Sequence, residues 1–517
     1  MYVTECIRRP AALTPDKPAL VFGDRTTSFS ELLNRVARCA GGLRQLGLGA
    51  GERVAILGLN SDRLIELMYG SIWAGGVANN LNLRWTVHEL AYAILDSAAA
   101  ILAVDESFVD RVPQLRELCP CIRQVIHLGE REAPAGTVAY ADMLNTTDPI
   151  ADQCADSNAL AFLNYTGGTT GMSKGVMLTH AALLAGSEMM LSAGFFVRGE
   201  TTGLVLPLFH IAGAAIPLSN FLVGNTIVIM PSFDPLDAAK LISAARIGQT
   251  VMIPTMIQMI LDHPEFGEYD LTCLKHLHYG GSAISEALVR RTREELPHAK
   301  LMQIYGQTEG LPATTLPDED HCTDGPMKDH LRSAGRPSPH CEIRIVGCEG
   351  KQLGIGEIGE IVYTGPQLMK GYWNKPELNA SSLVDGWLHT GDAGYLDKDG
   401  YLYVVDRLKD MIVTGGENVY SSEVENAIAK HPGVTGCVVI AVPDAKWGEA
   451  VHAILTLKAG QDVSAEELKE HCRRLIAGYK VPRSFEFRSS LPKTPVGKVD
   501  KASLRAPHWL GHSRRIS

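Results

Sequence analysis

YTGGTTGMSKG, residues 165–175, is the most informative stretch of this sequence. It follows an apolar, strand-like run at 159–163 and precedes a helical run that begins at His180. Glycines allow backbone conformations in which successive N–H groups converge on an anion, and threonine hydroxyls add further donors. Four Gly, three Thr and one Lys in eleven residues therefore favour a phosphate-binding loop over a glycine-rich turn without function.

The loop differs from the Walker motif of P-loop hydrolases. That motif needs glycine directly before its lysine and Ser or Thr directly after it. Here Ser173 precedes Lys174 and Gly175 follows it. An ordinary P-loop hydrolase is therefore disfavoured.

Length and charge exclude some classes of protein. A chain of 517 residues is too long for one ordinary core, so at least two domains are expected. Hydrophobic residues make up 45% and charged residues 21%, as in a globular protein. The net charge of −10 argues against a nucleic-acid binder, because such proteins use broad basic surfaces.

The cysteines and apolar stretches predict a reduced, cytoplasmic protein. Of eleven cysteines only Cys119 and Cys121 are close in sequence, and no second pair completes a zinc site. The N-terminus lacks the order of a signal peptide. The most apolar stretch, 204–230, is interrupted by Pro207 and Pro217, so no stable membrane insertion is expected.

The order of expected elements predicts an α/β fold. β-branched runs alternate with helical stretches through the first four hundred residues, which is typical of doubly wound parallel sheets. Between 333 and 405 short strands are separated by Gly and Pro turns, as in an antiparallel subdomain. We predict a large domain over 1–408, with two doubly wound sheets and this β-subdomain, and a small mobile α/β domain over 409–517. In the small domain, Ser422 and Glu425 predict a capping box that opens a helix.

With these residues in place, the chain resembles the adenylate-forming superfamily of acyl-CoA synthetases, peptide-synthetase adenylation domains and firefly-type luciferases. The phosphate loop of that family has ten fixed positions, and this chain matches eight, with Gly167 in place of serine and Ser173 in place of proline. Further motifs follow in the family's order at 206–213, 279–283, 305–309, 386–392, 406–410, 415–418 and 492–498. The likeness to fatty-acyl-type synthetases extends to Gly371-Tyr-Trp-Asn374.

The resemblance implies a role for each matching residue. It implies catalytic roles for Lys498, Glu309, Thr308 and His210, and Mg²⁺ binding by Glu309 and Thr169. Nucleotide binding is implied for Thr166, Gly167, Gly168, Thr169, Thr170, Gly171, Lys174, Gly281, Ser282, Ala283, Tyr305, Gly306, Gln307, Thr308, Asp392 and Arg407. An acyl pocket is implied at His210, Gly213, Ala214, Gly280 and Gly281, a hinge at Lys409, and coenzyme A binding at Gly415, Gly416 and Glu417.

The chemistry explains these residue types. A carboxylate that attacks the α-phosphate of ATP brings two anions together, so cations directed at the transition state are the main aid a protein can give. Taken alone, Glu309 would be a solvated carboxylate and Lys498 a surface lysine. The motifs in which Glu309 and Lys498 stand favour the catalytic roles.

The remaining candidates each have a structural alternative. A turn residue is the alternative for Asp392, an interdomain salt bridge for Arg407, and a core residue for Tyr305. The alternative for His210, a histidine in an apolar segment, is a satisfied core residue.

The sequence therefore predicts an ATP-dependent carboxylic acid–CoA ligase that uses ATP, Mg²⁺ and coenzyme A. The small, apolar segment 211–218 favours a hydrophobic monocarboxylic acid. After the first half-reaction the small domain is expected to rotate about Lys409. Gly415–Asn418 would then take the place of Lys498 in the site for the second half-reaction. Alternatives are a ligase that loads a carrier protein, a luciferase-like oxidation of the adenylate, an enzyme of only one half-reaction, and an inactive binding homologue. A homodimer is compatible with the sequence.

Overall fold

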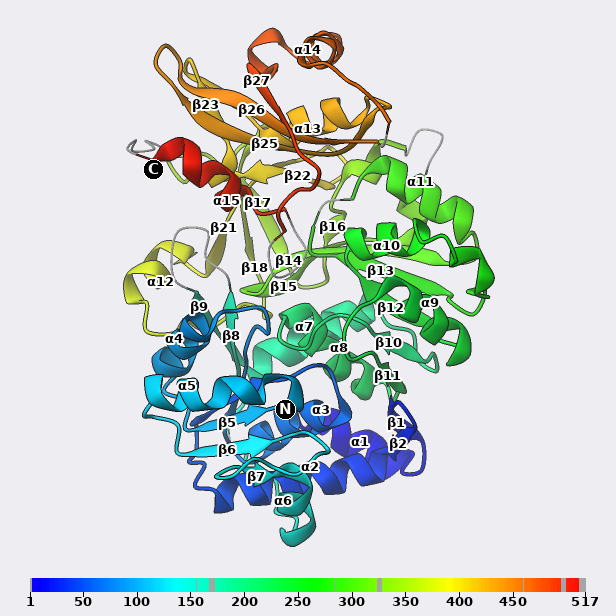
Figure 1. The fold of residues 1–517 in the computed structure, drawn as a ribbon, viewed down its shortest axis with the longest axis vertical. Coiled ribbons are helices and arrows are strands. Elements are labelled where there is room, and N and C mark those ends of the chain that lie inside the picture. The colour runs from blue at the N-terminus through cyan, green and yellow to red at the C-terminus, as the bar shows by residue number, and fades with distance from the viewer. Residues whose placement is uncertain are drawn as a thin grey trace. The chain divides into compact units, whose positions relative to one another are not determined.

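The computed structural model describes residues 2–154, 156–166, 173–282, 284–322, 328–458, 460–493 and 499–510 (Figure 1). The chain forms two compact units: Met1–Ile343 with Tyr363–Leu388, and Arg344–Val362 with His389–Ser517. Residues 389–408 thus group with the C-terminal part of the chain. The predicted boundary after residue 408 marks the point about which the small domain is expected to rotate, and it stays a prediction.

The first unit contains an eight-stranded sheet in the order β19-β9-β8-β4-β3-β5-β6-β7. All strand pairs from β8 to β7 in this order are parallel, whereas β9 is antiparallel to both β8 and β19. Helices α4 (Val87–Ser97) and α5 (Val112–Leu118) pack on it through apolar side chains such as Ile94 and Leu115. The strands are β3 (Arg53–Leu57), β4 (Val77–Asn80), β5 (Ile101–Val104), β6 (Gln124–His127), β7 (Val138–Ala139), β8 (Leu160–Thr166), β9 (Lys174–Thr179) and β19 (Gly371–Tyr372).

A nine-stranded sheet of the same unit has the order β16-β15-β14-β13-β12-β10-β11-β1-β2. Its central pairs are parallel and its edges antiparallel. Helices α9 (Pro235–Ala244), α10 (Pro254–Leu261) and α11 (Glu286–Glu295) share an apolar core with it. The strands are β1 (Pro18–Phe22), β2 (Arg25–Ser28), β10 (Thr202–Leu204), β11 (Ile227–Ile229), β12 (Gln249–Met252), β13 (His276–Gly280), β14 (Lys300–Gln307), β15 (Gly310–Leu316) and β16 (Arg336–Pro337). The two sheets confirm the predicted α/β fold class.

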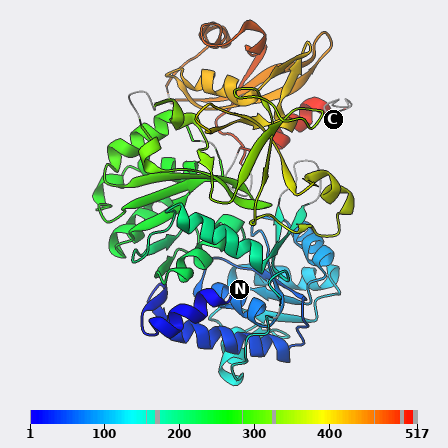
Figure 2. The ribbon, with the colours of Figure 1, turned by 180° about the vertical axis from the view of Figure 1, so that it is seen from behind.

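Two helices lie between these sheets (Figures 1 and 2). Helix α7 (His180–Ser192) contacts β9 of one sheet and β15 of the other. Helix α8 (Ile211–Leu222) packs against α7, β10 and α1 (Glu5–Leu13). Helices α7 and α8, which follow the phosphate loop in the chain, therefore connect the two sheets of the first unit.

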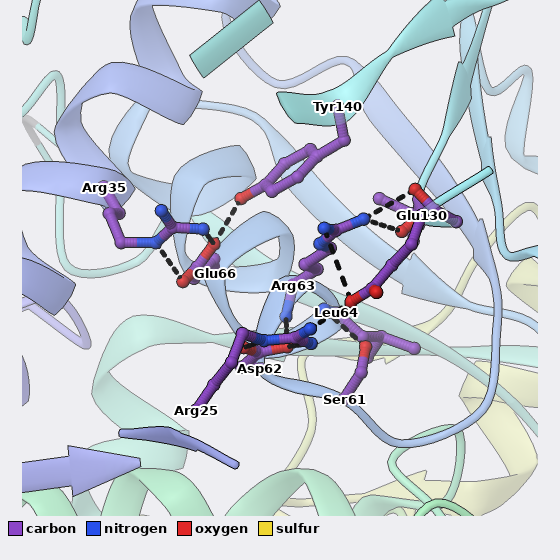
Figure 3. A network of polar contacts seen from close by, with 11 residues as sticks. Arg25, Arg35, Ser61, Asp62, Arg63, Leu64, Glu66, Glu130 and Tyr140 are labelled. Carbon is purple, nitrogen blue, oxygen red and sulfur yellow. Dashed lines mark hydrogen bonds and ion pairs between the residues drawn. The ribbon is translucent and has the colours of Figure 1, made fainter. Parts of the chain in front are cut away.

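A buried polar network fastens α3 (Asp62–Trp73) to its neighbours (Figure 3). The Glu66 side chain has no exposed surface, and its carboxylate accepts hydrogen bonds of 2.5 and 2.9 Å from Arg35 of α2 (Phe29–Gln45). Tyr140, which opens α6 (Tyr140–Thr146), donates a third bond of 2.8 Å. One turn away, Asp62 pairs with Arg25 at 2.8 Å. These bonds offset part of the cost of burying the carboxylate, whose pKa is still raised by its burial.

The variant Arg35→Leu tests this network. Removing one partner of a buried ion pair leaves the other uncompensated, so we expect a loss of about 3 kcal/mol in the free energy of unfolding. Urea unfolding monitored by circular dichroism measures it. Arg35→Leu/Glu66→Leu should recover most of the loss. A double variant as unstable as the single one would show that the charge of Glu66 is not the cause.

Apart from β19, the strands after residue 341 form two further sheets. The first has the order β17-β18-β21-β20, with β22 paired to β21, and its pairs β20–β21 and β21–β22 are antiparallel, as predicted for this subdomain. The second has the order β24-β23-β26-β25, with β27 paired to β26. The strands are β17 (Glu342–Val346), β18 (Gly359–Thr364), β20 (Leu383–Val384), β21 (Trp387–Leu396), β22 (Leu402–Arg407), β23 (Ile412–Thr414), β24 (Glu417–Val419), β25 (Val434–Asp444), β26 (Gly448–Leu457) and β27 (Ser484–Phe487).

Helices cover both faces of the C-terminal sheet. Helices α13 (Ser421–Ala429) and α14 (Ala465–Arg473) share one apolar cluster with it, and Leu504 of α15 (Lys501–Arg505) joins a second. The predicted capping box of α13 is wrong. Its N-cap is Tyr420, which makes no side-chain cap. Glu425 instead accepts a bond from the Val439 N–H and pairs with Lys501, since β25 and α15 offer it buried partners.

No helix in the described parts of the chain combines the length and apolar character that crossing a bilayer requires.

Candidate functional site

The predicted phosphate loop joins two strands of a hairpin. Thr166, the last residue of β8, lies opposite Lys174, the first residue of β9. This register brings both ends of the loop together. Gly167, Gly168, Thr169, Thr170 and Gly171 lie outside the described residues.

Lys174 belongs to a group of three side chains from separate segments. Its Nζ lies 5.2 Å from the ring centroid of Tyr372, a cation–π distance. The Tyr372 hydroxyl donates a 2.7 Å hydrogen bond to Oε1 of Glu309, in the turn between β14 and β15. The structure thus unites two predicted site residues through a third that was not predicted. We call Lys174, Tyr372 and Glu309 the Tyr372 group.

Backbone contacts hold Tyr372 in place. The Asn379 side chain of α12 (Pro376–Ser382) accepts from the Tyr372 N–H at 2.6 Å and donates to its carbonyl at 3.0 Å. Tyr372 also pairs with Val176 across β19 and β9. The Met369 N–H donates to the Glu309 carbonyl at 2.7 Å. These bonds fix the phenol beside the end of the phosphate loop.

The variant Tyr372→Phe should loosen Glu309 without unfolding the protein. A hydrogen bond to a charged group contributes about 1.5–3 kcal/mol, so we expect roughly a tenfold or greater rise in the Mg²⁺ concentration needed for half-maximal pyrophosphate exchange. Tyr140→Phe is the matched control, because it removes a 2.8 Å phenol–carboxylate bond at Glu66. If Tyr372→Phe and wild type need the same Mg²⁺ concentration, the expectation that Tyr372 holds Glu309 for Mg²⁺ binding is contradicted.

The predicted nucleotide-binding residues between 281 and 307 lie at the ends of two neighbouring strands. Gly280 ends β13 opposite Ile304 of β14. Gly281 and Ser282 follow it, while Tyr305, Gly306 and Gln307 end β14. Carboxyl ends of adjacent parallel strands are a common place for ligands in α/β sheets. Ala283 lies outside the described residues, and the nucleotide-binding roles stay predictions.

Two predicted acyl-pocket glycines have packing reasons of their own. A Cβ on Gly280 would lie 2.5 Å from the Ile304 carbonyl oxygen, and one on Gly213 would lie 2.2 Å from that of Pro207. Ala214 is buried in α8. Close backbone packing therefore explains these small residues without a ligand.

His210 caps α8. Its Nδ1 accepts a 3.2 Å hydrogen bond from the Ala212 N–H, which satisfies one of the free donors at a helix start. His210 is half-buried, so it is a capping residue and not the core residue that was the structural alternative. A catalytic role for His210 stays a prediction.

A small cavity lies beside α7 and α8. Thr308, a predicted catalytic residue, is part of its wall, and Glu309 of the Tyr372 group is the next residue. None of His210, Gly213, Ala214, Gly280 and Gly281 lines it. The described residues that do are Leu178, Ala182, Leu183, Gly186, Ser187, Met190, Ile211, Ala215, Thr308, Leu311 and Gln367, without a charged side chain.

In the second unit Asp392 and Arg407 form an ion pair. They lie directly opposite each other on β21 and β22, with Arg407 Nε 2.6 Å from Asp392 Oδ1. The Asp392 side chain is only 4% exposed. Two of the predicted nucleotide-binding residues thus form an ion pair, in which the Arg407 guanidinium orients the Asp392 carboxylate.

Lys409 lies next to this pair in η5 (Leu408–Asp410), a short 3-10 helix. Burial, together with the nearby Arg407 charge, lowers the pKa of its ammonium to about 8, against the opposing effect of Asp410. Asp410 itself pairs with Arg505 at 2.8 Å. The predicted hinge residue therefore has an unusual electrostatic environment.

This environment predicts an unusual titration. Because the pKa of Lys409 lies below that of an exposed lysine, its charge is lost as the pH rises through about 8. NMR of the ¹³C-dimethylated protein should show a lysine signal titrating there. The α-amino group also titrates near this pH, so Lys409→Arg identifies the signal by its loss. A Lys409 signal that titrates with the exposed lysines would contradict the described burial.

The predicted coenzyme A loop is a tight hairpin. Gly415 and Gly416, with φ of 62° and 87°, join β23 to β24, which begins at Glu417. The Gly415 N–H donates to the Trp447 carbonyl at 2.9 Å, and a Cβ on Gly415 would lie 2.7 Å from the indole ring. Glycine is therefore required here by conformation and by space. Lys498, the predicted catalytic lysine, lies in 494–498, outside the described residues.

Comparison with known proteins gives the family. Residues 7–373 match the family described as AMP-binding enzyme, and residues 423–498 match the AMP-binding enzyme C-terminal domain. The chain is 36% identical over 508 residues to the fatty acid–[acyl-carrier-protein] ligase ScoC of Streptomyces coeruleorubidus, covering 97% of this chain and 96% of that protein. It is 37% identical over 498 residues to a feruloyl-CoA synthase of an Amycolatopsis species, covering 96% and 97%.

A solved structure has the same fold over nearly the whole chain. It is o-succinylbenzoate CoA synthetase (MenE) from Bacillus subtilis in complex with the acyl-adenylate intermediate OSB-AMP. The TM-score is 0.84 at 30% identity, covering 96% of this chain and 97% of that one. The phosphate loop, the Tyr372 group and these relatives agree: this chain belongs to the adenylate-forming AMP-binding enzymes, near the fatty-acyl-CoA synthetases, and is an ATP-dependent acid–thiol ligase.

Proposed function

We propose that this ligase activates a hydrophobic monocarboxylic acid as its adenylate and transfers the acyl group to coenzyme A. One observation carries the choice of acid: Thr308 lines the cavity, and its neighbour Glu309 belongs to the Tyr372 group. The cavity has a volume of about 20 Å³, so it would have to widen to admit an apolar tail, and the tail's carboxylate would then lie toward the phosphate-handling residues. Since no charged side chain of the described residues lines the cavity, a second carboxylate would have no partner.

The Tyr372 group fits a Mg²⁺-dependent step. Mg²⁺ prefers hard oxygen ligands, and Glu309 supplies a carboxylate whose Oε1 is held by Tyr372 while Oε2 remains to bind an ion. Bound Mg²⁺ would neutralise phosphate charge. Lys174 would add a cation at the end of the loop, and Thr169, outside the described residues, is the second proposed ligand.

The second unit would hold the ribose and supply the catalytic lysine. Asp392 would accept hydrogen bonds from the ribose hydroxyls while Arg407 keeps its carboxylate ionised and oriented. Lys498 would stabilise charge while the carboxylate attacks the α-phosphate. We further propose that rotation about Lys409 then replaces Lys498 by the hairpin at Gly415, Gly416 and Glu417 for thioester formation.

The main alternative concerns the acceptor of the acyl group. One relative is named as a fatty acid–acyl-carrier-protein ligase and another as a CoA synthase, and the two have nearly the same sequence identity to this chain. We favour coenzyme A because most of the relatives compared carry CoA in their names.

AMP release with coenzyme A, with a phosphopantetheinylated carrier protein and with neither tests both choices. We expect AMP to form with medium-chain or aromatic monocarboxylates and coenzyme A, and at least a hundredfold less with dicarboxylates of equal length, because burying an unpaired charge costs several kcal/mol. Turnover only with the carrier protein would overturn the choice of acceptor. A preference for dicarboxylates would overturn the assignment of the cavity.

We also propose a cytoplasmic location and no nucleic-acid partner. All eleven cysteines are free, as expected of a chain in a reducing compartment. The net charge of −10 disfavours binding to phosphate backbones. A homodimer remains part of the proposal, and light scattering of the purified protein would test it.

A further inference from the structure

We propose that His452, Glu486 and His508 form a binding site for a divalent transition metal of the zinc type. One ligand atom from each residue lies within 4.8 Å of the other two. Two imidazoles and a carboxylate suit zinc, whereas Mg²⁺ prefers oxygen ligands only. The site is therefore chemically different from the one proposed at Glu309.

The fold of the C-terminal sheet brings the three residues together. His452 lies on β26, and the neighbouring parallel strand β27 carries Glu486. His508 lies in η7 (Ala506–Trp509), a short 3-10 helix that Trp509 anchors by donating a 3.0 Å hydrogen bond to the Ala441 carbonyl of β25. Residues 56 positions apart in sequence thus meet beside this sheet.

His452 presents a buried nitrogen without a hydrogen-bond partner. The residue is 6% exposed, and its Nδ1 shares a 2.7 Å hydrogen bond with the Ser484 hydroxyl. Its Nε2 is buried and makes no hydrogen bond. Metal-binding histidines commonly use one ring nitrogen for such an orienting bond and the other for the metal.

The Glu486 carboxylate is held next to His452 Nε2. Its Oε1 accepts a 2.5 Å hydrogen bond from Arg488, and its Oε2 lies 3.6 Å from His452 Nε2. Metal–ligand bonds of about 2.1 Å in a tetrahedron place two ligand atoms roughly 3.4 Å apart. The 3.6 Å separation is close to that value and too long for a hydrogen bond. His508 would be the third ligand, since its ring nitrogen lies within 4.8 Å of both other ligand atoms, and water would supply the fourth.

A second group of the same composition lacks these features and serves as a control. His431 Nε2 lies 3.2 Å from Glu467 Oε1, within hydrogen-bond distance, and His431 Nδ1 accepts from the Gly433 N–H at 3.3 Å. His471 Nε2 bonds the Ala427 carbonyl at 3.0 Å. Three of these four ring nitrogens are thus occupied.

Metal titration of the full-length protein, stripped with a chelator and kept in millimolar Mg²⁺ without ATP, tests the proposal. We expect one Zn²⁺ per chain by isothermal titration calorimetry. His508→Ala and Glu486→Gln should each weaken binding at least tenfold, since changes even to outer ligand partners cost 10–100-fold. The control His471→Ala should bind as wild type does, and circular dichroism verifies that each variant is folded.

Co²⁺ in place of Zn²⁺ reports the ligand type. A tetrahedral visible spectrum without thiolate charge transfer is expected, and it should disappear in His508→Ala. The proposal is overturned if no metal binds, if binding survives both ligand variants, if His471→Ala weakens it equally, or if a thiolate band shows that cysteines hold the ion.

Discussion

The hydrogen bond from Tyr372 to Glu309 is the interaction on which the account of this ligase depends. It joins the turn after β14 to β19, and β19 pairs with β9, where the phosphate loop ends at Lys174. One carboxylate and one ammonium are thereby fixed beside a single phenol. Because the proposed adenylation brings two anions together, placing these charges before substrate arrives would avoid reorganisation during the reaction. Thr308, in the wall of the small cavity, directly precedes Glu309 in the chain.

Much of the fold could be predicted from the sequence. The strand-like run at 159–163 lies largely in β8, and the helix expected from His180 is α7. Such elements depend on local periodicity, which the sequence carries. The capping box at Ser422 was wrong, because buried partners on β25 and α15 compete for Glu425. Local rules fail where tertiary contacts offer a residue a better partner.

The site could be predicted only where it lies in a recognisable motif. Lys174 and Glu309 were found in this way, and the structure brings them together. Tyr372 was quoted as part of a motif but had no role, since its contact with Glu309 spans 63 positions and depends on strand pairing. The predicted acyl-pocket residues His210, Gly213 and Ala214 do not line the cavity, whereas Ile211 and Ala215 of the same helix do, because the sequence does not show which side of α8 faces inward. The acyl pocket stays a prediction. The ion pair of Asp392 and Arg407 likewise became visible only as a cross-strand contact.

The central claim is that one chain performs two separate half-reactions and that Lys498 serves only the first. The most direct measurement compares Lys498→Ala with wild type, starting once from acid plus ATP and once from a synthetic acyl-adenylate plus coenzyme A. The account predicts a loss of about 10²–10³-fold in forming the adenylate, as for removal of other groups that stabilise transition-state charge. It predicts nearly unchanged thioester formation from the adenylate. Equal impairment of both reactions would contradict it.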